Sequence, residues 1–159
     1  MQFDPKDYDD ARCGKYRALS LFQPWAKYAT EPFFHRDGWE ALFPIIFVAK
    51  YTDYRGDLLI CSAGPEGQTA GLVEVYDCIP AKQLAEDEWG KACAMKSERK
   101  KMAKRFALFT RNPRRVIEYP AKGEVGKLWE YVCPKGELME YPRIVKLGAD
   151  GFKKMMKGK

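Results

Sequence analysis

The sequence has little of what metal and disulfide sites require. It contains one histidine, His35, and five cysteines dispersed along the chain, of which no two stand at C-x-x-C spacing. A structural zinc site uses four closely spaced Cys and His ligands, and an odd, scattered set of cysteines does not form a disulfide framework. We therefore expect neither a metal nor another cofactor, and a reducing, cytoplasmic setting.

Long hydrophobic runs are also missing. The longest, Phe43 to Ala49, is interrupted by Pro44 and falls far short of the ~18 residues that a membrane-spanning helix needs. The first ten residues, M-Q-F-D-P-K-D-Y-D-D, lack the charged and then apolar layout of a secretory signal. We expect no membrane association and no export.

Acidic residues are scarce in one segment of the chain. Between Lys96 and Arg115 there are nine basic residues and one acid, Glu98, in a protein whose net charge is +6. The C-terminal sequence K-K-M-M-K-G-K is a second basic block. Such a surplus favours polyanionic partners, although a basic run is also typical of an ordinary solvated helix face.

The residues that are present indicate a folded chain of mostly short strands. Of the 159 residues 46% are hydrophobic, enough for one domain with its own core. Alternating or β-branched runs predict strands over 16–22, 43–49, 58–63, 70–78, 105–110, 116–119 and 125–133. Helices are expected over 24–30 and 82–104, a turn at 112–113, and a loop or helical turn over 33–42.

This succession of elements predicts an α+β fold. We expect a small mixed β-barrel of about five to six strands, decorated by two to four helices, and not a βαβ series. The barrel domain is expected over 16–133. Residues 1–15 are interpreted as an N-terminal arm and 134–159 as a C-terminal extension with a basic tail.

Five sequence blocks occur in a characteristic order. They are L-S-L-F-Q-P-W-A at 19–26, Y-R-G-D-L-L-I at 54–60, G-L-V-E-V-Y-D-C at 71–78, F-A-L-F-T-R-N-P-R-R-V at 106–116 and P-A-K-G-E-V-G-K-L-W-E-Y at 120–131. Over 16–132 this order resembles the ASCH domain, a branch of the PUA-like β-barrel superfamily. The resemblance implies a helix after the first strand and a cleft between barrel and helices that binds RNA or nucleotides. Some relatives hydrolyse modified cytidine, and some have been credited with RNA cleavage.

The chain departs from the family in its signature, G-x-K-x-x-E-x-R. The corresponding positions here are Ala41, Phe43, Ile46 and Val48, which are all apolar. In the hydrolase relatives the reaction is thought to need the signature lysine and a threonine beside a glutamate that matches Glu74. A carboxylate without such partners is a poor acid–base apparatus, so the sequence favours a protein without catalytic activity.

The resemblance and the charge pattern together nominate a binding site. Gln23, Trp25 and Tyr54 are expected to face a base, and Glu74 is the catalytic candidate. The side chains expected to hold phosphates are Arg55, Lys100, Lys101, Lys104, Arg105, Arg111, Arg114 and Arg115. Each has a purely structural alternative: Gln23 and Trp25 as a strand-to-helix corner, and Glu74 in a salt bridge with Lys50 or Arg55.

Three functions remain open from the sequence. The first is RNA or nucleotide binding through a basic, aromatic-walled cleft. The second is hydrolysis of a modified nucleoside or of RNA by Glu74, and the third is a non-catalytic interaction or scaffold protein with an occluded cleft. Apolar side chains filling the cleft at positions 43, 46 and 48 would favour the third. The sequence leaves the oligomeric state open.

Overall fold

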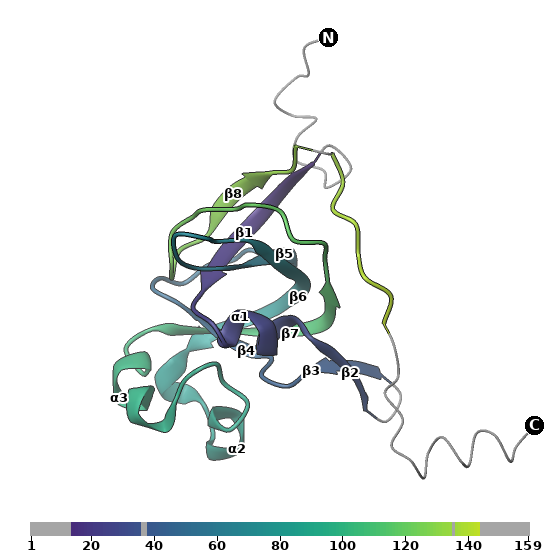
Figure 1. The fold of residues 1–159 in the computed structure, drawn as a ribbon. Helices are drawn as coiled ribbons and strands as arrows, with labels where there is room; N and C mark the ends of the chain where they lie inside the picture. Colours follow the sequence, from purple (N-terminus) through teal and green to yellow (C-terminus); the bar gives the residue numbers. More distant parts are fainter. Residues whose placement is uncertain (1–13, 36–37, 135, 144–159) are drawn as a thin grey trace, which may run out of the picture.

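The computed structural model of the protein describes residues 14–35, 38–134 and 136–143. Residues 1–13 of the predicted N-terminal arm and the basic C-terminal tail lie outside these ranges. The described part combines one curled six-stranded sheet, a two-stranded sheet and several short helices, as Figure 1 shows. The predicted α+β class is therefore confirmed.

The large sheet has the strand order β4-β7-β6-β5-β1-β8. Its strands are β1 (Lys15–Leu21), β4 (Ile45–Val48), β5 (Gly56–Ser62), β6 (Thr69–Pro80), β7 (Phe106–Arg115) and β8 (Trp129–Val132). β1 and β5 are parallel, and every other neighbouring pair in this sheet is antiparallel. The sheet curls into a half-barrel, which is the mixed architecture that the sequence predicted.

One segment bridges the two sides of the curled sheet. Val125 forms a β-bridge with Ser20, beyond the part of β1 that pairs with β8. Gly126 accepts a hydrogen bond from the backbone N–H of Ala49 at 2.8 Å, just after the other edge strand, β4. The 125–126 segment therefore closes the gap between β4 and β1, and brings parts of the chain that are distant in sequence together.

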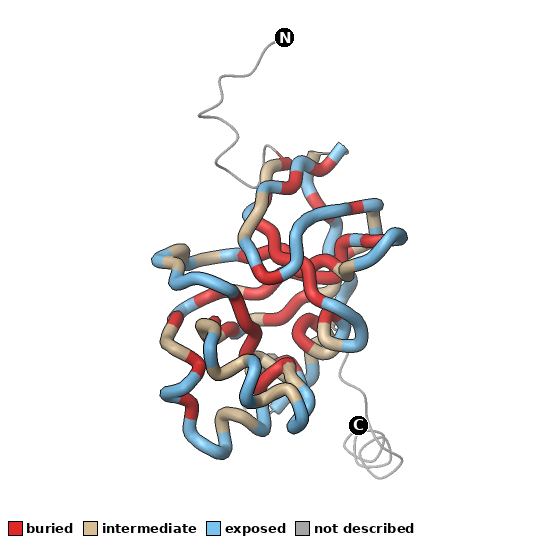
Figure 2. Tube along the Cα trace, turned by 90° about the vertical axis from the view of Figure 1, so that its left-hand side faces the viewer, coloured by how far each residue is buried: buried red, intermediate tan, exposed pale blue. Residues whose placement is uncertain are grey.

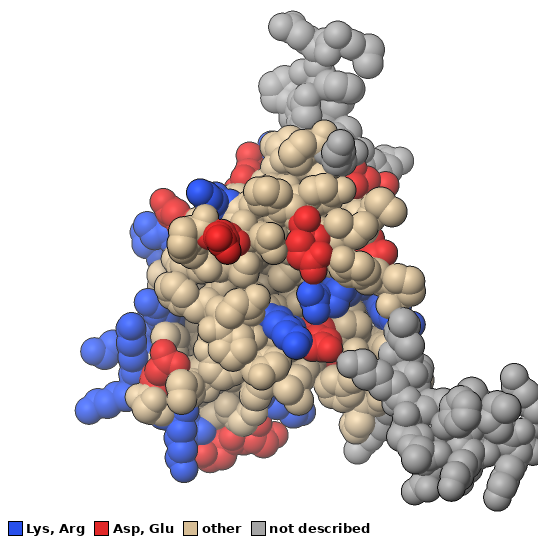
Figure 3. All heavy atoms as spheres, in the orientation of Figure 1, with Lys and Arg blue, Asp and Glu red and all other residues tan. Residues whose placement is uncertain are grey.

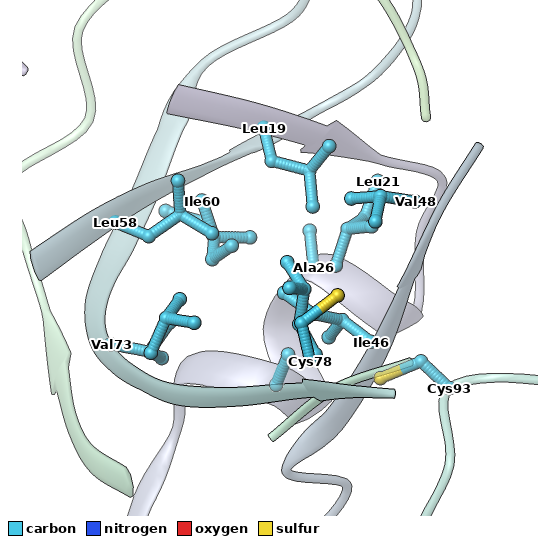
Figure 4. Packing of buried hydrophobic residues seen from close by; sticks show 14 residues of the cluster. Leu19, Leu21, Ala26, Ile46, Val48, Leu58, Ile60, Val73, Cys78 and Cys93 are labelled. Carbon is cyan, nitrogen blue, oxygen red and sulfur yellow. The ribbon is translucent and has the colours of Figure 1, made fainter. Parts of the chain in front are cut away.

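Alternate residues of the strands fill the inside of the half-barrel. Leu19, Ile46, Leu58, Val73 and their neighbours form one buried cluster, drawn in Figure 4. Successive side chains of a strand point to opposite faces, so this cluster takes every second residue of each strand. The short helix α1 (Trp25–Thr30) follows β1 directly, as predicted, and adds its two buried alanines to the same cluster.

Two further clusters cover the outside of the sheet. One packs Ile45, Phe47 and Ala107 against the 81–94 segment, and the other covers the outer faces of β1, β5 and β8. Figure 2 shows buried segments through the middle of the described chain and exposed segments around its periphery. Buried layers on both sides of the sheet explain why its central strands are almost continuously apolar.

The predicted long helix over 82–104 is wrong. The segment forms four short helical pieces: η3 (Ala81–Gln83), α2 (Glu86–Trp89), η4 (Lys96–Glu98) and α3 (Arg99–Met102). Ala81, Leu84 and Ala92 all pack on the outer face of β4 and β7, and the chain follows that surface. Tertiary packing has overridden local helix propensity here.

The predicted turn at Asn112 and Pro113 is also wrong, because both residues lie inside β7. Glu74 pairs with Arg111 and Leu72 with Arg114, so two residues of β7 oppose Val73 alone. This is a β-bulge, where Asn112 takes a φ of 54° and a proline is tolerated.

Two other predictions also change. The ambiguous 33–42 segment is a hairpin of β2 (Pro32–His35) and β3 (Gly38–Ala41). The predicted strand over 116–119 is wrong, since Val116 there forms only an isolated bridge with Glu140.

Candidate functional site

The Gln23-Pro24-Trp25 corner joins β1 to α1. The side-chain carbonyl of Gln23 accepts the backbone N–H of Lys27 at 3.1 Å, and the Gln23–Pro24 peptide bond is cis. The indole of Trp25 packs edge to face against Phe43, with 5.4 Å between the ring centroids. The corner therefore has a complete structural role in starting the helix and seating it on the barrel.

Tyr54 and Arg55 lie at the other end of the β1–β5 pair. The guanidinium of Arg17 stands 5.7 Å from the ring centroid of Tyr54, whose hydroxyl donates to the carbonyl of Asp57. Burial raises the pKa of Tyr54, and the nearby Asp57 adds to that rise. Arg55 is exposed and donates to the carbonyls of Thr52 and Tyr54 at 3.1 and 2.8 Å.

The parallel pairing of β1 with β5 separates the Gln23–Trp25 corner from Tyr54 and Arg55. Ala18 lies opposite Leu59 and Leu21 opposite Ser62, so the amino ends of both strands lie together. Gln23 follows the carboxyl end of β1, whereas Arg55 precedes the amino end of β5. The structure does not bring Gln23 and Trp25 together with Tyr54 and Arg55.

The four positions of the family signature are occupied by packed hydrocarbon. Ile46 and Val48 point into the barrel and are 0% and 2% exposed. Phe43 packs against Trp25 and Tyr28, and Ala41 is buried at the end of β3. Apolar side chains thus fill positions 43, 46 and 48, which is the outcome stated above to favour an interaction protein with an occluded cleft. A ligand of this protein would have to bind at another surface.

Glu74 lies on the outer face of the sheet. Its neighbours Val73 and Val75 fill the barrel interior, so its own side chain points away from that core. The predicted partners Lys50 and Arg55 are wrong: the carboxylate pairs with the guanidinium of Arg111, which lies directly opposite on β7. Glu74 thus belongs to a partly exposed ion pair.

Arg111 and its neighbours on β7 already have partners within the fold. The guanidinium of Arg111 also covers the ring of Tyr76, 5.1 Å from its centroid. Arg114, 9% exposed, donates to both carboxylate oxygens of Asp57 at 2.7 and 3.3 Å. Arg115 donates to the carbonyl of Ala70 at 3.1 Å.

Arg114 can be tested as a structural residue. We expect Arg114→Ala to lower the free energy of unfolding by roughly 1–2 kcal/mol, because it removes a bidentate ion pair. The loss stays moderate because the side chain of Asp57 is 49% exposed and can rehydrate. Urea denaturation followed by circular dichroism measures it.

The matched control is Arg55→Ala. Among the described residues this exposed arginine donates to backbone carbonyls and to no carboxylate, so its removal should change stability by less than ~0.5 kcal/mol. Equal stabilities of the two variants would contradict a structural role for Arg114.

An open cleft of about 410 Å³ lies between the β2–β3 hairpin, β7 and α2. Its aromatic walls are Phe33, Trp39, Tyr76 and Phe109. Its charged lining residues are Glu40, Asp87, Glu88, Lys91 and Arg111, so the two signs are mixed. Of the residues nominated from the sequence, Arg111 alone is among those lining it. Most of the aromatic wall comes from the hairpin and from strand positions that sequence analysis did not nominate.

A separate surface gathers several lysines without ion-pair partners. Lys100, Lys101 and Lys104 at α3 are exposed, and within the described residues none of them forms an ion pair. We define the basic surface by these lysines and their neighbours Lys50, Lys82 and Arg105. Figure 3 shows Lys and Arg side chains gathered at the edge of the molecule that carries α3 in Figure 1.

Two connections place the basic surface at one end of β4 and β7. Val48 lies opposite Phe106, so the residues that follow β4 meet those that precede β7. The carbonyl of Arg105 accepts the backbone N–H of Ala81, the neighbour of Lys82. The predicted phosphate-binding residues therefore fall into two groups. One lies on the basic surface and consists of Lys100, Lys101, Lys104 and Arg105. The other lies elsewhere and consists of Arg55, Arg111, Arg114 and Arg115.

The described residues offer little to metal or thiol chemistry. They contain no group of three or more His, Cys, Asp or Glu side chains arranged to hold a metal ion. Burial raises the pKa of Cys61 to about 12, so its thiolate is scarce near neutral pH. No helix in the same ranges is long and apolar enough to cross a membrane.

No protein-family model matches the chain, and no curated protein matches it. Solved structures do resemble it. A serine-to-alanine mutant of ZmASCH from Zymomonas mobilis has a TM-score of 0.52 at 11% sequence identity, covering 92% of this chain and 96% of that one. A tyrosine-to-phenylalanine mutant of the same protein has a TM-score of 0.50 at 13% identity, covering 65% and 73%. At such identities the likeness concerns the fold, and the chain has an ASCH-like fold, as its sequence blocks predicted.

Proposed function

We propose that the protein is a non-catalytic RNA-binding module with an ASCH-like fold, and that it binds the phosphate backbone through the basic surface. The observation that carries this proposal is the gathering of Lys50, Lys82, the three lysines near α3 and Arg105 at one end of the sheet. Unpaired, solvated cations bind phosphates without first giving up an internal partner.

The shape of the basic surface favours a polymer over a single nucleotide. Its side chains come from the loop after β4, from η3, from α3 and from the two residues that precede β7. All of them are exposed except that of Arg105, which is half-buried. Several cations spread over such a surface suit a backbone of regularly spaced phosphates. The aromatic cleft, in contrast, has carboxylates of Glu40, Asp87 and Glu88 in its lining, which repel phosphates.

The absence of catalysis in this proposal is supported by the state of Glu74. Its carboxylate is paired with Arg111 on the outer face of the sheet, and the signature positions hold apolar side chains, of which Ile46 and Val48 point into the barrel on the opposite face. General acid–base catalysis needs a carboxylate within hydrogen-bond reach of the reacting group and with a matched pKa. The guanidinium of Arg111 instead occupies Oε2 of this carboxylate.

Salt-dependent binding tests the proposal. Filter binding to a short RNA at ~50 and ~200 mM salt should show affinity falling steeply with salt for the unmodified protein. In the double variant K100A/K104A we expect weaker binding at ~50 mM and a slope of log K against log salt that is smaller by roughly 1.4, at ~0.7 per lost phosphate contact.

The control is K27A/K91A, which removes the same charge from exposed lysines on α1 and next to α2. It should retain the slope of the unmodified protein. Absence of RNA binding at ~50 mM salt, or an equal fall in slope for both double variants, would refute the proposal.

A further inference from the structure

The basic surface has an exposed aromatic ring at its edge, that of Tyr51. This side chain follows β4 by three residues and is 56% exposed. It meets Phe106 with 6.0 Å between ring centroids and an interplanar angle of 71°. An edge-to-face contact of this kind covers at most one face of the tyrosine ring, so at least one face is left free by Phe106.

Tyr51 stands among cations contributed by distant parts of the chain. Lys50 precedes it, and Phe106, which it contacts, follows Arg105 directly. The guanidinium of Arg105 reaches Gly126, where an added Cβ would lie 2.9 Å from its Nη1. The carbonyl of Gly126 in turn accepts a hydrogen bond from the backbone N–H of Ala49, two residues before Tyr51. The tyrosine ring and Arg105 therefore lie in the same part of the surface.

Two other exposed rings of the described residues, those of Tyr76 and Phe34, lack this combination. The ring of Tyr76 is covered by the guanidinium of Arg111, and Phe34 meets Trp39 on the hairpin, away from α3. Tyr51 is the exposed ring that touches the start of β7, where the basic surface begins.

We propose, resting on the RNA-binding function proposed above, that Tyr51 is a stacking platform for an unpaired base and that the ligand is single-stranded RNA. A positively charged surface holds either form of RNA, but an aromatic face binds only a base that is free of its own stack. Phosphates at the α3 lysines and a base on Tyr51 together select an unpaired strand.

The test compares one RNA sequence as a single strand and as a duplex, by filter binding at ~50 mM salt. Tyr51→Leu keeps an apolar contact with Phe106 and removes the π-face, and Tyr51→Phe keeps the ring. We expect Y51L to bind the single strand about tenfold more weakly, with an unchanged salt slope and unchanged duplex affinity. Y51F should remain within about twofold of the unmodified protein.

Phe34→Leu is the matched control, since it removes an exposed ring outside the basic surface. It should leave both affinities unchanged. Thermal unfolding of each variant confirms that the fold is retained.

The outcomes separate this inference from the function beneath it. Equal single-strand affinity of Y51L and the unmodified protein, or equal losses for single strand and duplex, would overturn the stacking role. The loss of salt slope in K100A/K104A would still support RNA binding. If neither Y51L nor K100A/K104A differed in RNA binding from the unmodified protein, both proposals would be refuted.

Discussion

Replacing Ile46 with glutamate, the residue type of the family signature at this point, should destroy the folded state or come close to it. Ile46 is 0% exposed, lies in the barrel interior and pairs through its backbone with Leu108. A carboxyl group there loses its hydration and gains no cationic partner among the described core residues. We expect the free energy of unfolding to fall by roughly 4 kcal/mol or more, a large part of the stability of a domain of this size.

Urea denaturation of I46E, followed by circular dichroism, measures the effect, and Ile46→Val is its control. The valine variant removes one methylene from the same place and should cost only about 1 kcal/mol. If I46E proved as stable as I46V, position 46 would be accessible to water and the barrel interior could be a ligand cleft.

The loss in I46E should also depend on pH in a definite direction. Burial raises the pKa of a carboxyl group above the ~4.3 of an unfolded glutamate. The folded variant then holds its proton at higher pH than the unfolded chain does. Its remaining stability is therefore greatest below pH ~4.3 and declines as the pH rises through the folded-state pKa, relative to I46V at each pH.

Gly71→Ala should produce the second large effect. An added Cβ on Gly71 would lie 2.5 Å from the Cβ of Thr30 and closer still to the backbone carbonyl oxygen of Arg114. Thr30 is fully buried at the end of α1 and donates its hydroxyl to the carbonyl of Ala26 at 2.8 Å. The methyl group would have to displace either α1 or β7, and we expect a loss of about 3 kcal/mol.

Gly38→Ala is the control, because an added Cβ at the start of β3 meets nothing within 4 Å. It should change stability by less than ~0.5 kcal/mol. Thermal unfolding of the two variants compares them directly. A G71A protein as stable as G38A would mean that α1 is not seated against β6 as closely as the structure has it.

Local patterns in the sequence were sufficient for much of the fold. The alternation of Leu19 and Leu21 with polar or small residues predicted β1, and Pro24 and Pro32 bounded the helix that follows. Alternation also placed Val73 and Val75 on the face of β6 opposite to Glu74, but only the structure decided that the two valines, and not Glu74, point into the barrel. These inferences held because strand periodicity and the missing N–H of proline act within a few residues.

The same reasoning failed where contacts with residues distant in the sequence decide the local conformation. Residues 82–104 have helix-forming side chains, yet they follow the surface of β4 and β7 in short pieces. Asn112 and Pro113 read as a turn, yet their hydrogen-bonding neighbour β6 draws them into a bulged strand. Propensity is worth tenths of a kcal/mol per residue, and burial of an apolar face outweighs it.

The candidate site, too, could be predicted from the sequence only in part. Composition alone established that positive charge is concentrated between Lys96 and Arg115 and that the signature positions had become apolar. Only the folded chain determines which of those charges are free: Arg111 and Arg114 meet carboxylates from β6 and β5, while the lysines near α3 meet none in the described residues. Ion pairs of this kind depend on the register between strands that are dozens of residues apart in the sequence. The proximity of Tyr51 to Arg105 depends on the same register. A linear sequence specifies which side chains exist, whereas their neighbours follow from long-range contacts that no local pattern encodes.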